Sequence, residues 1–530
     1  MTNLSSIPHW ENLSLSQQIA QLFIIRASGY LFDHEIKYPQ WELNNSQLEH
    51  LIKDLSIGGI ILLGGSAAEI KLRTEKLQSL TNIPLLVCAD VEEGVGQRFS
   101  GATWFPPPMS LSSIYTKNPD LAKFYAAKMG EFTALESLTI GINWILAPIV
   151  DVNNNPDNPV INIRAFGETS EVVSELTTAF IRGCQKYAVL TTAKHFPGHG
   201  DTNIDSHLDL PVLSHDLNRL KSVELPSFQT AIHAGVNAVM TAHLLIPSLD
   251  NNKPATLSYH ILTKLLREDL GFNGLIVTDA LIMGAIAKTY GANEAPLLAL
   301  EAGADLLLMP ENAEDSIKTI YDAVKSGRIS EQRISASLNR IFQAKNHLFN
   351  KENNQFSLFD LYCEESAHTS QEILQQSQQV FGQVPLEKPV NNQELYRNII
   401  IVDDVFNSKF LGKHTPSVTI PQKLGYELLI SDRHTPPTNY QFDQPAKTLL
   451  QIFMRGNPFR GSAGVTPLAE TWCNYLLETK QLQALIIYGS PYILEKFLPQ
   501  LPDFIPCIFS YSQTTESQAV VCKLLFQLSD

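Results

Sequence analysis

The run from Lys194 to Pro211 holds the most informative set of reactive side chains in the sequence. Pro and Gly interrupt three histidines, three aspartates and a lysine, which are Lys194, His195, His199, Asp201, Asp205, His207 and Asp209. A run of this kind cannot form the packed face of a helix or strand, so it predicts an irregular polar loop. Loops positioned by a rigid scaffold often carry binding and catalytic residues.

Three interpretations of this loop stay open from the residue types alone. In the first, His195, His199 and Asp201 bind a divalent metal ion. A metal-dependent hydrolase of that kind would also use His207. In the second, Asp205 accepts a hydrogen bond from one ring nitrogen of His207, which fixes the tautomer and raises the basicity of the ring for acid/base chemistry. In the third, the polar groups only cap one another in a tight loop.

Asp279 follows directly after the apolar run Leu275–Thr278. A carboxylate at the end of a buried strand has little freedom, which is what a nucleophile requires. The alternative is that Asp279 caps the N-terminus of the helix that follows, as Asp commonly does at such a junction.

Two further loops each carry an arginine, Arg98 after Asp90 and Arg164 at the end of the segment 155–164. The planar guanidinium suits carboxylates, amide oxygens and sugar hydroxyls. Taken alone, an arginine of this kind is more often a solvated or ion-paired surface residue.

The elements that must position these residues are eight short apolar runs, each followed by a longer stretch of helical periodicity. The runs are Gln21–Ile25, Gly59–Leu63, Leu85–Ala89, Asn143–Ala147, Val189–Ala193, Ala238–Ala242, Leu275–Thr278 and Asp305–Met309. Near-continuous apolar strands indicate burial on both faces, as in a parallel sheet wrapped by helices. The pattern predicts an α/β fold with an N-terminal (β/α)8 TIM-type barrel, and a doubly wound sheet is the alternative. Several of the runs end in polar residues, His243 among them, which should meet at the carboxyl rim of the strands.

The chain of 530 residues is long enough for two domains. We expect a barrel domain at residues 1–349, a helix-containing linker at 350–394, and a smaller C-terminal α/β domain at 395–530. Four apolar runs predict a small, mostly parallel sheet there: Asn398–Asp403, Lys447–Phe453, Ala484–Tyr488 and Pro506–Phe509. The segment 454–462, with Arg455 and Arg460, follows one of these runs; it could reach a substrate cleft or be a surface turn.

The run from Lys194 to Pro211, together with Val277–Met283, resembles the bacterial β-N-acetylglucosaminidases of glycoside hydrolase family 3. The resemblance covers about residues 15–345 and extends more weakly into the second domain. It implies a barrel fold and the release of terminal β-linked N-acetylglucosamine with retention of configuration. It places the nucleophile on Asp279, the acid/base on His207 and the residue orienting that histidine on Asp205. It places the sugar-binding residues on Asp90, Arg98, Arg164, Lys194 and His195.

One loop departs from the family pattern. After Asp90 the family has Glu-Gly-Gly-Arg-Val from the second residue onward, whereas this chain has Glu92-Glu93-Gly94-Val95-Gly96. Glu93 thus replaces a glycine and Val95 an arginine, which bears on the geometry of the loop and on the role of Arg98.

The resemblance implies an exo-acting hydrolase that trims peptidoglycan-derived fragments in cell-wall recycling, through a covalent glycosyl-aspartate intermediate. No cofactor or metal is expected for this chemistry. An imidazole adds no negative charge beside the acceptor, so a β-N-acetylglucosaminide phosphorylase is an alternative. A β-glucosidase on the same scaffold and a non-catalytic muropeptide-binding protein are further alternatives.

The composition bears on partners and location. The chain has 39 basic and 54 acidic residues and a net charge of −15, which disfavours nucleic acid as a partner. Neither a signal-peptide pattern nor an unbroken apolar run of membrane-spanning length is found, so no membrane partner is expected. The six cysteines form no C-x-x-C pair and are typical of reduced thiols, which favours a cytoplasmic location. The oligomeric state is not determined by the sequence.

Overall fold

The computed structural model describes residues 7–349, 356–386, 394–434, 444–456 and 467–528. Contacts between residues divide the chain into two compact units, Met1–Ser370 and Gln371–Asp530. A helix, α13 (Glu364–Ser377), lies in the segment 350–394 for which we predicted a helix-containing linker. The predicted domain limits themselves stay a prediction.

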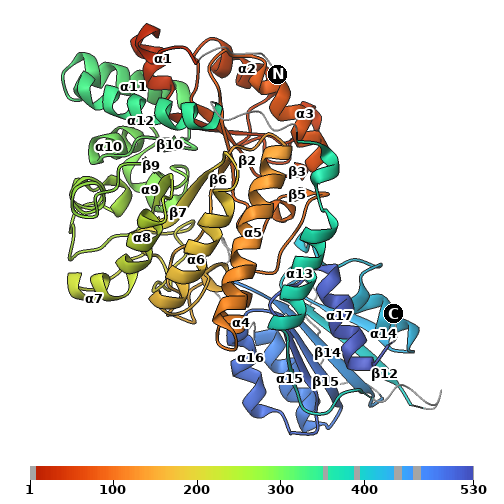
Figure 1. Ribbon diagram of the computed structural model, residues 1–530. Coiled ribbons are helices and arrows are strands. Elements are labelled where there is room, and N and C mark those ends of the chain that lie inside the picture. Colours follow the sequence, from red (N-terminus) through yellow and green to blue (C-terminus); the bar gives the residue numbers. More distant parts are fainter. Residues whose placement is uncertain (1–6, 350–355, 387–393, 435–443, 457–466, 529–530) are drawn as a thin grey trace. The chain divides into compact units, whose positions relative to one another are not determined.

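The first unit is built on an eight-stranded parallel sheet that curves into a nearly closed barrel (Figure 1). Its strands are β1 (Phe23–Ala27), β2 (Gly59–Leu62), β4 (Leu86–Ala89), β6 (Trp144–Ile145), β7 (Leu190–Phe196), β8 (Ala238–Thr241), β9 (Leu275–Val277) and β10 (Leu307–Leu308). Their order in the sheet is β10-β1-β2-β4-β6-β7-β8-β9. From β1 to β9 the strands therefore follow the order of the chain, and β10 pairs with β1. A bridge between Val277 in β9 and Leu306, next to β10, links the two ends of this order. The predicted TIM-type barrel is therefore confirmed, and the doubly wound alternative is wrong.

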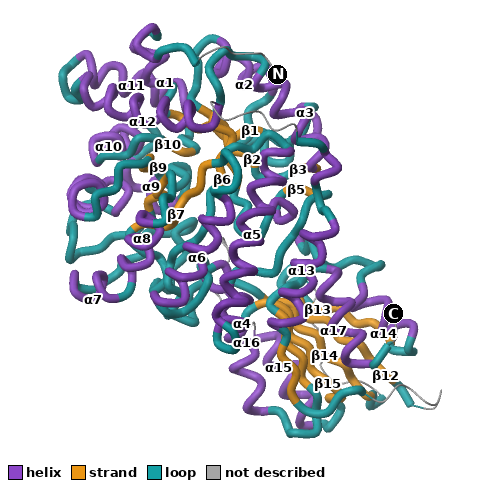
Figure 2. Tube along the Cα trace, viewed as in Figure 1, coloured by secondary structure: helices purple, strands orange, loops and turns teal. Residues whose placement is uncertain are grey.

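Helices surround these strands (Figure 2). They are α1 (Leu15–Ala20), α2 (Asn45–Lys53), α3 (Ala67–Gln78), α4 (Met109–Tyr115), α5 (Pro119–Thr139), α6 (Ser170–Cys184), α7 (Leu217–Ser222), α8 (Glu224–His233), the π-helix η6 (His260–Asp269), α9 (Gly284–Tyr290), α10 (Glu294–Ala302), α11 (Ala313–Lys325) and α12 (Glu331–Phe349). A short separate pair, β3 (Gly65–Ser66) and β5 (Phe99–Ser100), lies outside the barrel sheet. Over the described ranges, no helix has the length and apolar character needed to cross a membrane.

The barrel strands are apolar because both of their faces are covered. Every residue of β1, β2, β4, β7 and β8 is buried. Residues of alternating orientation along a strand then face either the barrel interior or the surrounding helices, and both environments favour apolar side chains. The polar residues that the sequence places at strand ends consequently lie at the carboxyl rim, where the loops leave the barrel.

The second unit contains a six-stranded sheet. Its strands are β11 (Gln379–Phe381), β12 (Tyr396–Val402), β13 (Glu427–Ser431), β14 (Lys447–Met454), β15 (Leu482–Gly489) and β16 (Cys507–Ser510), in the order β11-β16-β15-β14-β12-β13. All pairings are parallel except that of β11 with β16. The predicted mostly parallel sheet is confirmed, but two strands were missed. Both are edge strands whose residues are largely exposed or half-buried, so they lack the apolar run by which the central strands are found.

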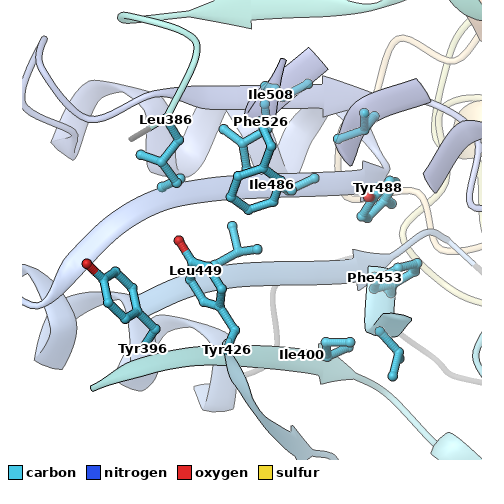
Figure 3. Close-up of a cluster of buried hydrophobic side chains, with 14 of the residues drawn as sticks. Leu386, Tyr396, Ile400, Tyr426, Leu449, Phe453, Ile486, Tyr488, Ile508 and Phe526 are labelled. Atoms are coloured by element: carbon cyan, nitrogen blue, oxygen red, sulfur yellow. The ribbon is translucent and has the colours of Figure 1, made fainter. Parts of the chain in front are cut away.

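Helices α14 (Pro416–Lys423), α15 (Pro467–Glu478), α16 (Pro491–Phe497) and α17 (Thr515–Phe526) complete the second unit. One face of its sheet forms an apolar core with side chains of α14 and α17, shown in Figure 3. In this core the rings of Phe453 and Tyr488 stack with their centroids 4.3 Å apart. Alternate residues such as Ile399 and Leu450 are buried on the opposite face, beside the apolar side of α15.

Candidate active site

Asp279 lies two residues beyond β9, at the carboxyl rim of the barrel. Its backbone N–H donates to Oγ1 of Thr241 (3.4 Å), and its own Oδ1 accepts from the backbone N–H of Ala280 (2.7 Å). Burial raises the pKa of the Asp279 carboxyl, but the neighbouring imidazoles of His243, His195 and His207 lower it more strongly, to about 2. The carboxylate is therefore ionised at neutral pH, as a nucleophile must be.

His207 is paired with Asp205 in the loop after β7. Nδ1 of His207 lies 2.8 Å from Oδ1 of Asp205, and the backbone N–H of His207 donates to the same oxygen (2.9 Å). The Asp205 side chain is fully buried, whereas one fifth of the His207 side chain is exposed. With Nδ1–H bonded to the carboxylate, any proton exchange by the ring would take place at Nε2. This geometry corresponds to the acid/base interpretation of the loop.

The structure brings Asp279 and His207 into one site. His207 is among the charges that lower the pKa of the Asp279 carboxyl. The backbone N–H of Gly284, five residues after Asp279, donates to the His207 carbonyl (3.3 Å). The start of α9, shortly after Asp279, and the loop that carries His207 are thus in direct contact although they lie far apart in the sequence.

A buried ion-pair network joins three of the predicted sugar-binding residues through Glu92. Arg164 donates to both oxygens of Glu92, from Nε to Oε2 and from Nη2 to Oε1, each at 2.9 Å. Lys194 Nζ lies 2.6 Å from Glu92 Oε1 and donates to Oδ1 of Asp90 at 2.7 Å. Only the Asp90 side chain, at 23% exposure, is substantially open to solvent. Asp90 and Lys194 thus share one edge of the barrel mouth.

Glu92 was missed as a site residue by the sequence analysis. Burial raises the pKa of its carboxyl, but the charges of Arg164 and Lys194 lower it well below its ordinary value. Burial lowers the pKa of the Lys194 amine, but the carboxylates of Asp90 and Glu92 raise it above its ordinary value. The signal that could have found Glu92 is an acidic residue two positions after Asp90, on the same strand-end loop.

Arg98 stays beside Asp90 in spite of the altered loop. Its Nε donates to the Asp90 backbone carbonyl (3.0 Å). The replacement residue Glu93 is buried and accepts from the indole N–H of Trp104 (2.9 Å). Gly94 adopts φ +86°, and a Cβ there would lie 2.6 Å from the Thr103 carbonyl oxygen. The loop is therefore folded onto segment 103–105, which accommodates Glu93 without displacing Arg98.

His195 and His199 both depend on Asp151, a second residue that the sequence analysis missed. Asp151 Oδ2 lies 2.8 Å from Nδ1 of His195, and Asp151 also accepts from the backbone N–H groups of both histidines. Burial raises the pKa of the Asp151 carboxyl, and His195 outweighs that effect, so the pKa is lowered. His195 is held in this way with its ring near Asp279.

Unlike His195, His199 has both of its ring nitrogens bonded to side chains of its own loop. Its Nδ1 lies 2.8 Å from Thr202 Oγ1 and its Nε2 lies 3.0 Å from Ser206 Oγ. Burial lowers the pKa of the His199 imidazole to about 4, so the ring is neutral. Asp201, the third member of the metal alternative, instead pairs with His215 at 2.8 Å. In the part of the chain that the structure describes, no three His, Cys, Asp or Glu side chains are arranged to hold a metal ion.

His243 is a further polar group near Asp279. It lies at the end of β8, fully buried, with Nδ1 2.8 Å from Thr256 Oγ1 and Nε2 3.0 Å from the Ala280 carbonyl oxygen. Burial lowers the pKa of its imidazole, and Nε2–H donates to the carbonyl oxygen. Through Ala280 this histidine fixes the backbone that carries Asp279. In the second unit, residues 457–462 of the predicted loop 454–462 lie outside the described residues.

Comparison with known proteins gives two family matches. The family described as "Glycosyl hydrolase family 3 N terminal domain" matches residues 14–344. The family described as "Bacterial Glycosyl hydrolase family 3 C-terminal domain" matches residues 389–527. Together they span both units.

Individual relatives agree with this result. The chain is 37% identical over 333 residues to Beta-hexosaminidase A of Pseudoalteromonas piscicida, covering 57% of this chain and 55% of the relative. It is 33% identical over 271 residues to a Beta-hexosaminidase of Methylobacillus flagellatus, covering 50% of this chain and 77% of the relative. The match thus spans about half of the first relative's length. The solved structure of a glycoside hydrolase family 3 beta-N-acetylglucosaminidase from Paenibacillus sp. str. FPU-7 is similar with a TM-score of 0.78 and 29% identity, covering 97% of both chains.

Proposed function

The chain belongs to glycoside hydrolase family 3, as its sequence predicted, and on that premise we propose that it is a retaining exo-β-N-acetylglucosaminidase. One observation carries the proposal. An ionised carboxylate, Asp279, and an imidazole held by a buried carboxylate, His207 on Asp205, belong to one site at the carboxyl rim of the barrel. A double-displacement glycosidase needs a nucleophile and an acid/base; most use two carboxyl groups, and here an imidazole takes the second role.

In the first step, Asp279 attacks the anomeric carbon of the terminal sugar. The bond between that carbon and the glycosidic oxygen breaks, and protonated His207 gives its Nε2 proton to the departing oxygen. The products are an aglycone alcohol and a glycosyl ester of Asp279. Because the attack inverts the anomeric carbon, the β-glycoside becomes an α-linked ester. Asp205 stabilises the imidazolium that donates, because it accepts the Nδ1–H bond throughout.

In the second step, neutral His207 takes a proton from water while the water oxygen attacks the anomeric carbon. The ester bond to Asp279 breaks and its carboxylate is regenerated. Two inversions give net retention, and His207 returns to its protonated form. The histidine thus acts in turn as acid and as base.

The sugar is bound, in this proposal, by Asp90, Arg98, Arg164, Lys194 and His195. Asp90 and Lys194 present a carboxylate and an ammonium to the hydroxyl groups, and the network through Glu92 prevents them from reorienting. Such pre-organisation converts binding into rate because the ring is held near the attacking oxygen. The similarity to the beta-N-acetylglucosaminidase of Paenibacillus sp. str. FPU-7 supports N-acetylglucosamine as the terminal residue.

The proposed substrates are muropeptides and related peptidoglycan-derived fragments, met in the cytoplasm during cell-wall recycling. The thiols support a reducing compartment: all six cysteines are free, and five of them are buried. Burial raises the pKa of Cys184, Cys473, Cys507 and Cys522. These thiols are therefore structural, not reactive.

Phosphorolysis is the second candidate reaction, favoured by one observation. The proposed acid/base is a histidine, which in its neutral form adds no negative charge of its own beside the acceptor. An anionic acceptor such as phosphate is therefore repelled less than it would be by a carboxylate base.

The test is an assay of 4-nitrophenyl β-N-acetylglucosaminide with and without phosphate, alongside the corresponding glucoside. Hydrolysis predicts free N-acetylglucosamine in both buffers, whereas phosphorolysis predicts the sugar 1-phosphate when phosphate is present. Asp279→Ala should abolish turnover, and Asp322→Asn, on the exposed side of α11, is the matched control. Release of N-acetylglucosamine by Asp279→Ala at a near-wild-type rate would remove the assignment. Faster turnover of the glucoside would instead identify a β-glucosidase.

A further inference from the structure

The loop that carries His207 is buried at Asp205, Ser206 and Leu213 but leaves much of its apolar surface exposed. Three of its large apolar side chains, Ile204, Leu208 and Val212, are 42%, 41% and 50% exposed. A loop of this kind gains little from burial of apolar surface, so the position of His207 depends on specific hydrogen bonds.

One anchor lies on the buried side of the loop. Ser206, between Asp205 and His207 in the chain, is hydrogen-bonded to Nε2 of His199 (3.0 Å). This contact holds the base of the loop but does not reach its outer turn, where the chain runs through His207 and Leu208.

Helix α9 provides a second anchor on that outer turn. The backbone N–H of Gly284 donates to the carbonyl oxygen of His207 (3.3 Å), and Nζ of Lys288 donates to the carbonyl oxygen of Leu208 (2.8 Å). Two consecutive carbonyl groups of the loop are thus bound by one turn of one helix.

The approach at Gly284 leaves no room for a side chain. A Cβ built there would lie 2.9 Å from the His207 carbonyl oxygen and 3.0 Å from that of Leu208. Contacts this short are not tolerated, so any other residue must push the loop away from the helix. The glycine is therefore required for close approach and not for an unusual backbone conformation.

The start of α9 is itself fixed to the barrel that positions Asp279. Between Asp279 and the helix, the backbone N–H of Leu281 donates to the carbonyl of Leu308 (2.9 Å), and that of Ile282 to the carbonyl of Met309 (3.2 Å). The segment is thereby tied to β10 and its continuation. Displacement of α9 relative to Asp279 would break these bonds.

We propose that helix α9 is a positioning element for the acid/base histidine, with Gly284 and Lys288 setting the place of His207 relative to Asp279. The inference rests on the proposed function, because it assigns the positioned group the role of proton donor. Gly284 and Lys288 touch neither substrate nor reacting atoms; they act through the loop backbone. The segment from Asp279 to Lys288 thus carries the nucleophile and also holds the loop of the acid/base histidine.

The experiment compares two leaving groups in two backgrounds. Gly284→Ala should lower kcat about tenfold on an alkyl β-N-acetylglucosaminide, which needs full protonation, because misplacing a catalytic group by a fraction of an ångström has that effect. It should lower kcat less than twofold on the 4-nitrophenyl glycoside, roughly the effect left when little proton donation is needed. KM should change little for either substrate. Alanine has the higher helix propensity, so the helix itself is not weakened.

In a His207→Ala background, Gly284→Ala should cause no further loss, since the two residues act through one group. Lys288→Met should show a weaker form of the same leaving-group dependence. Lys288→Arg should restore the wild-type rates on both substrates. Lys264→Met, an exposed lysine on η6, is the matched control.

Equal losses on both substrates, or the same loss with and without His207, would overturn the positioning role. The proposed function fails separately: in that case His207→Ala itself would show no dependence on the leaving group. A lowered melting temperature with unchanged leaving-group dependence would also count against the inference.

Discussion

Oδ1 of Asp205 accepts two hydrogen bonds from the same residue, one from Nδ1 of His207 and one from its backbone N–H. The carboxylate therefore fixes the ring and the main chain of His207 together. Both bonds are short, at 2.8 and 2.9 Å, and the carboxylate is fully buried.

Replacing Asp205 by Asn should separate its role as a hydrogen-bond acceptor from its role as a negative charge beside the imidazole. The amide oxygen can still accept from the backbone, but it carries no charge to stabilise the imidazolium. We expect kcat on alkyl glycosides to fall by roughly 10², within the range attributed to a positioned acid. Steady-state kinetics on alkyl and 4-nitrophenyl substrates checks this, and wild-type rates on both would refute the role of Asp205.

Removing His207 should leave attack by Asp279 intact on activated substrates. With His207→Ala, the 4-nitrophenyl glycoside should still form the glycosyl ester, and azide should accelerate its breakdown, because a small anion needs no base to attack. Mass spectrometry of the product should find the glycosyl azide. His233→Ala, on the exposed end of α8, is the control, and absence of any azide effect together with equal loss on all substrates would contradict the assignment.

The network through Glu92 makes a prediction for binding and for stability. Glu92→Gln removes the anion that Arg164 and Lys194 share, so Arg164 loses its buried anionic partner and Lys194 keeps only Asp90. We expect KM to rise and the free energy of unfolding to fall by about 3 kcal/mol, the cost usually found when one member of a buried pair is removed. A variant with unchanged KM and melting temperature would show that the network is dispensable.

The ion pairs of Glu92 also predict that the stability of the fold depends on pH. The pKa of the Glu92 carboxyl is lower in the folded protein than its ordinary value. The carboxylate thus contributes stability that is present above the unfolded-state pKa of about 4.3 and is lost as pH falls towards the lower folded-state pKa. The difference in melting temperature between wild type and Glu92→Gln should be full at pH 6 and shrink below pH 4. A constant difference would contradict this.

Lys345 predicts a second pH dependence, in a different pH range. It is fully buried on α12, donates to Oε1 of Gln21 (2.8 Å), and burial lowers the pKa of its amine to about 7. Between about pH 7 and 10.4 the unfolded chain binds a proton that the folded chain does not, so stability rises with pH over this window. Lys345→Met removes that dependence.

The free energy of unfolding of Lys345→Met should exceed that of the wild type most strongly at pH 6. The difference should shrink progressively up to pH 10. Urea unfolding at the two pH values measures the difference. The exposed Lys264→Met should show no such trend, and a difference that stays the same at every pH would refute the buried charge.

The fold could be predicted from the sequence wherever the strands are buried on both faces. Continuous apolar runs such as Ile60–Leu62 and Ile486–Tyr488 have no alternative to a core position, and both lie in central strands. The edge strands β11 and β13 could not be found in this way, because half-exposed residues carry no comparable pattern.

The sequence by itself determined the eight strand-helix units, the central sheet of the second unit, and the adjacency of Asp205 and His207, since these follow from residues close together in the chain. Only the tertiary structure decided that Glu92 joins Arg164 across 72 positions, that Asp151 holds His195 across 44, and that Gly284 meets the His207 carbonyl. The physical reason is that closing the barrel brings the carboxyl ends of all its strands to one rim. Which charges then pair depends on the geometry of that rim, and no local pattern of residues encodes it.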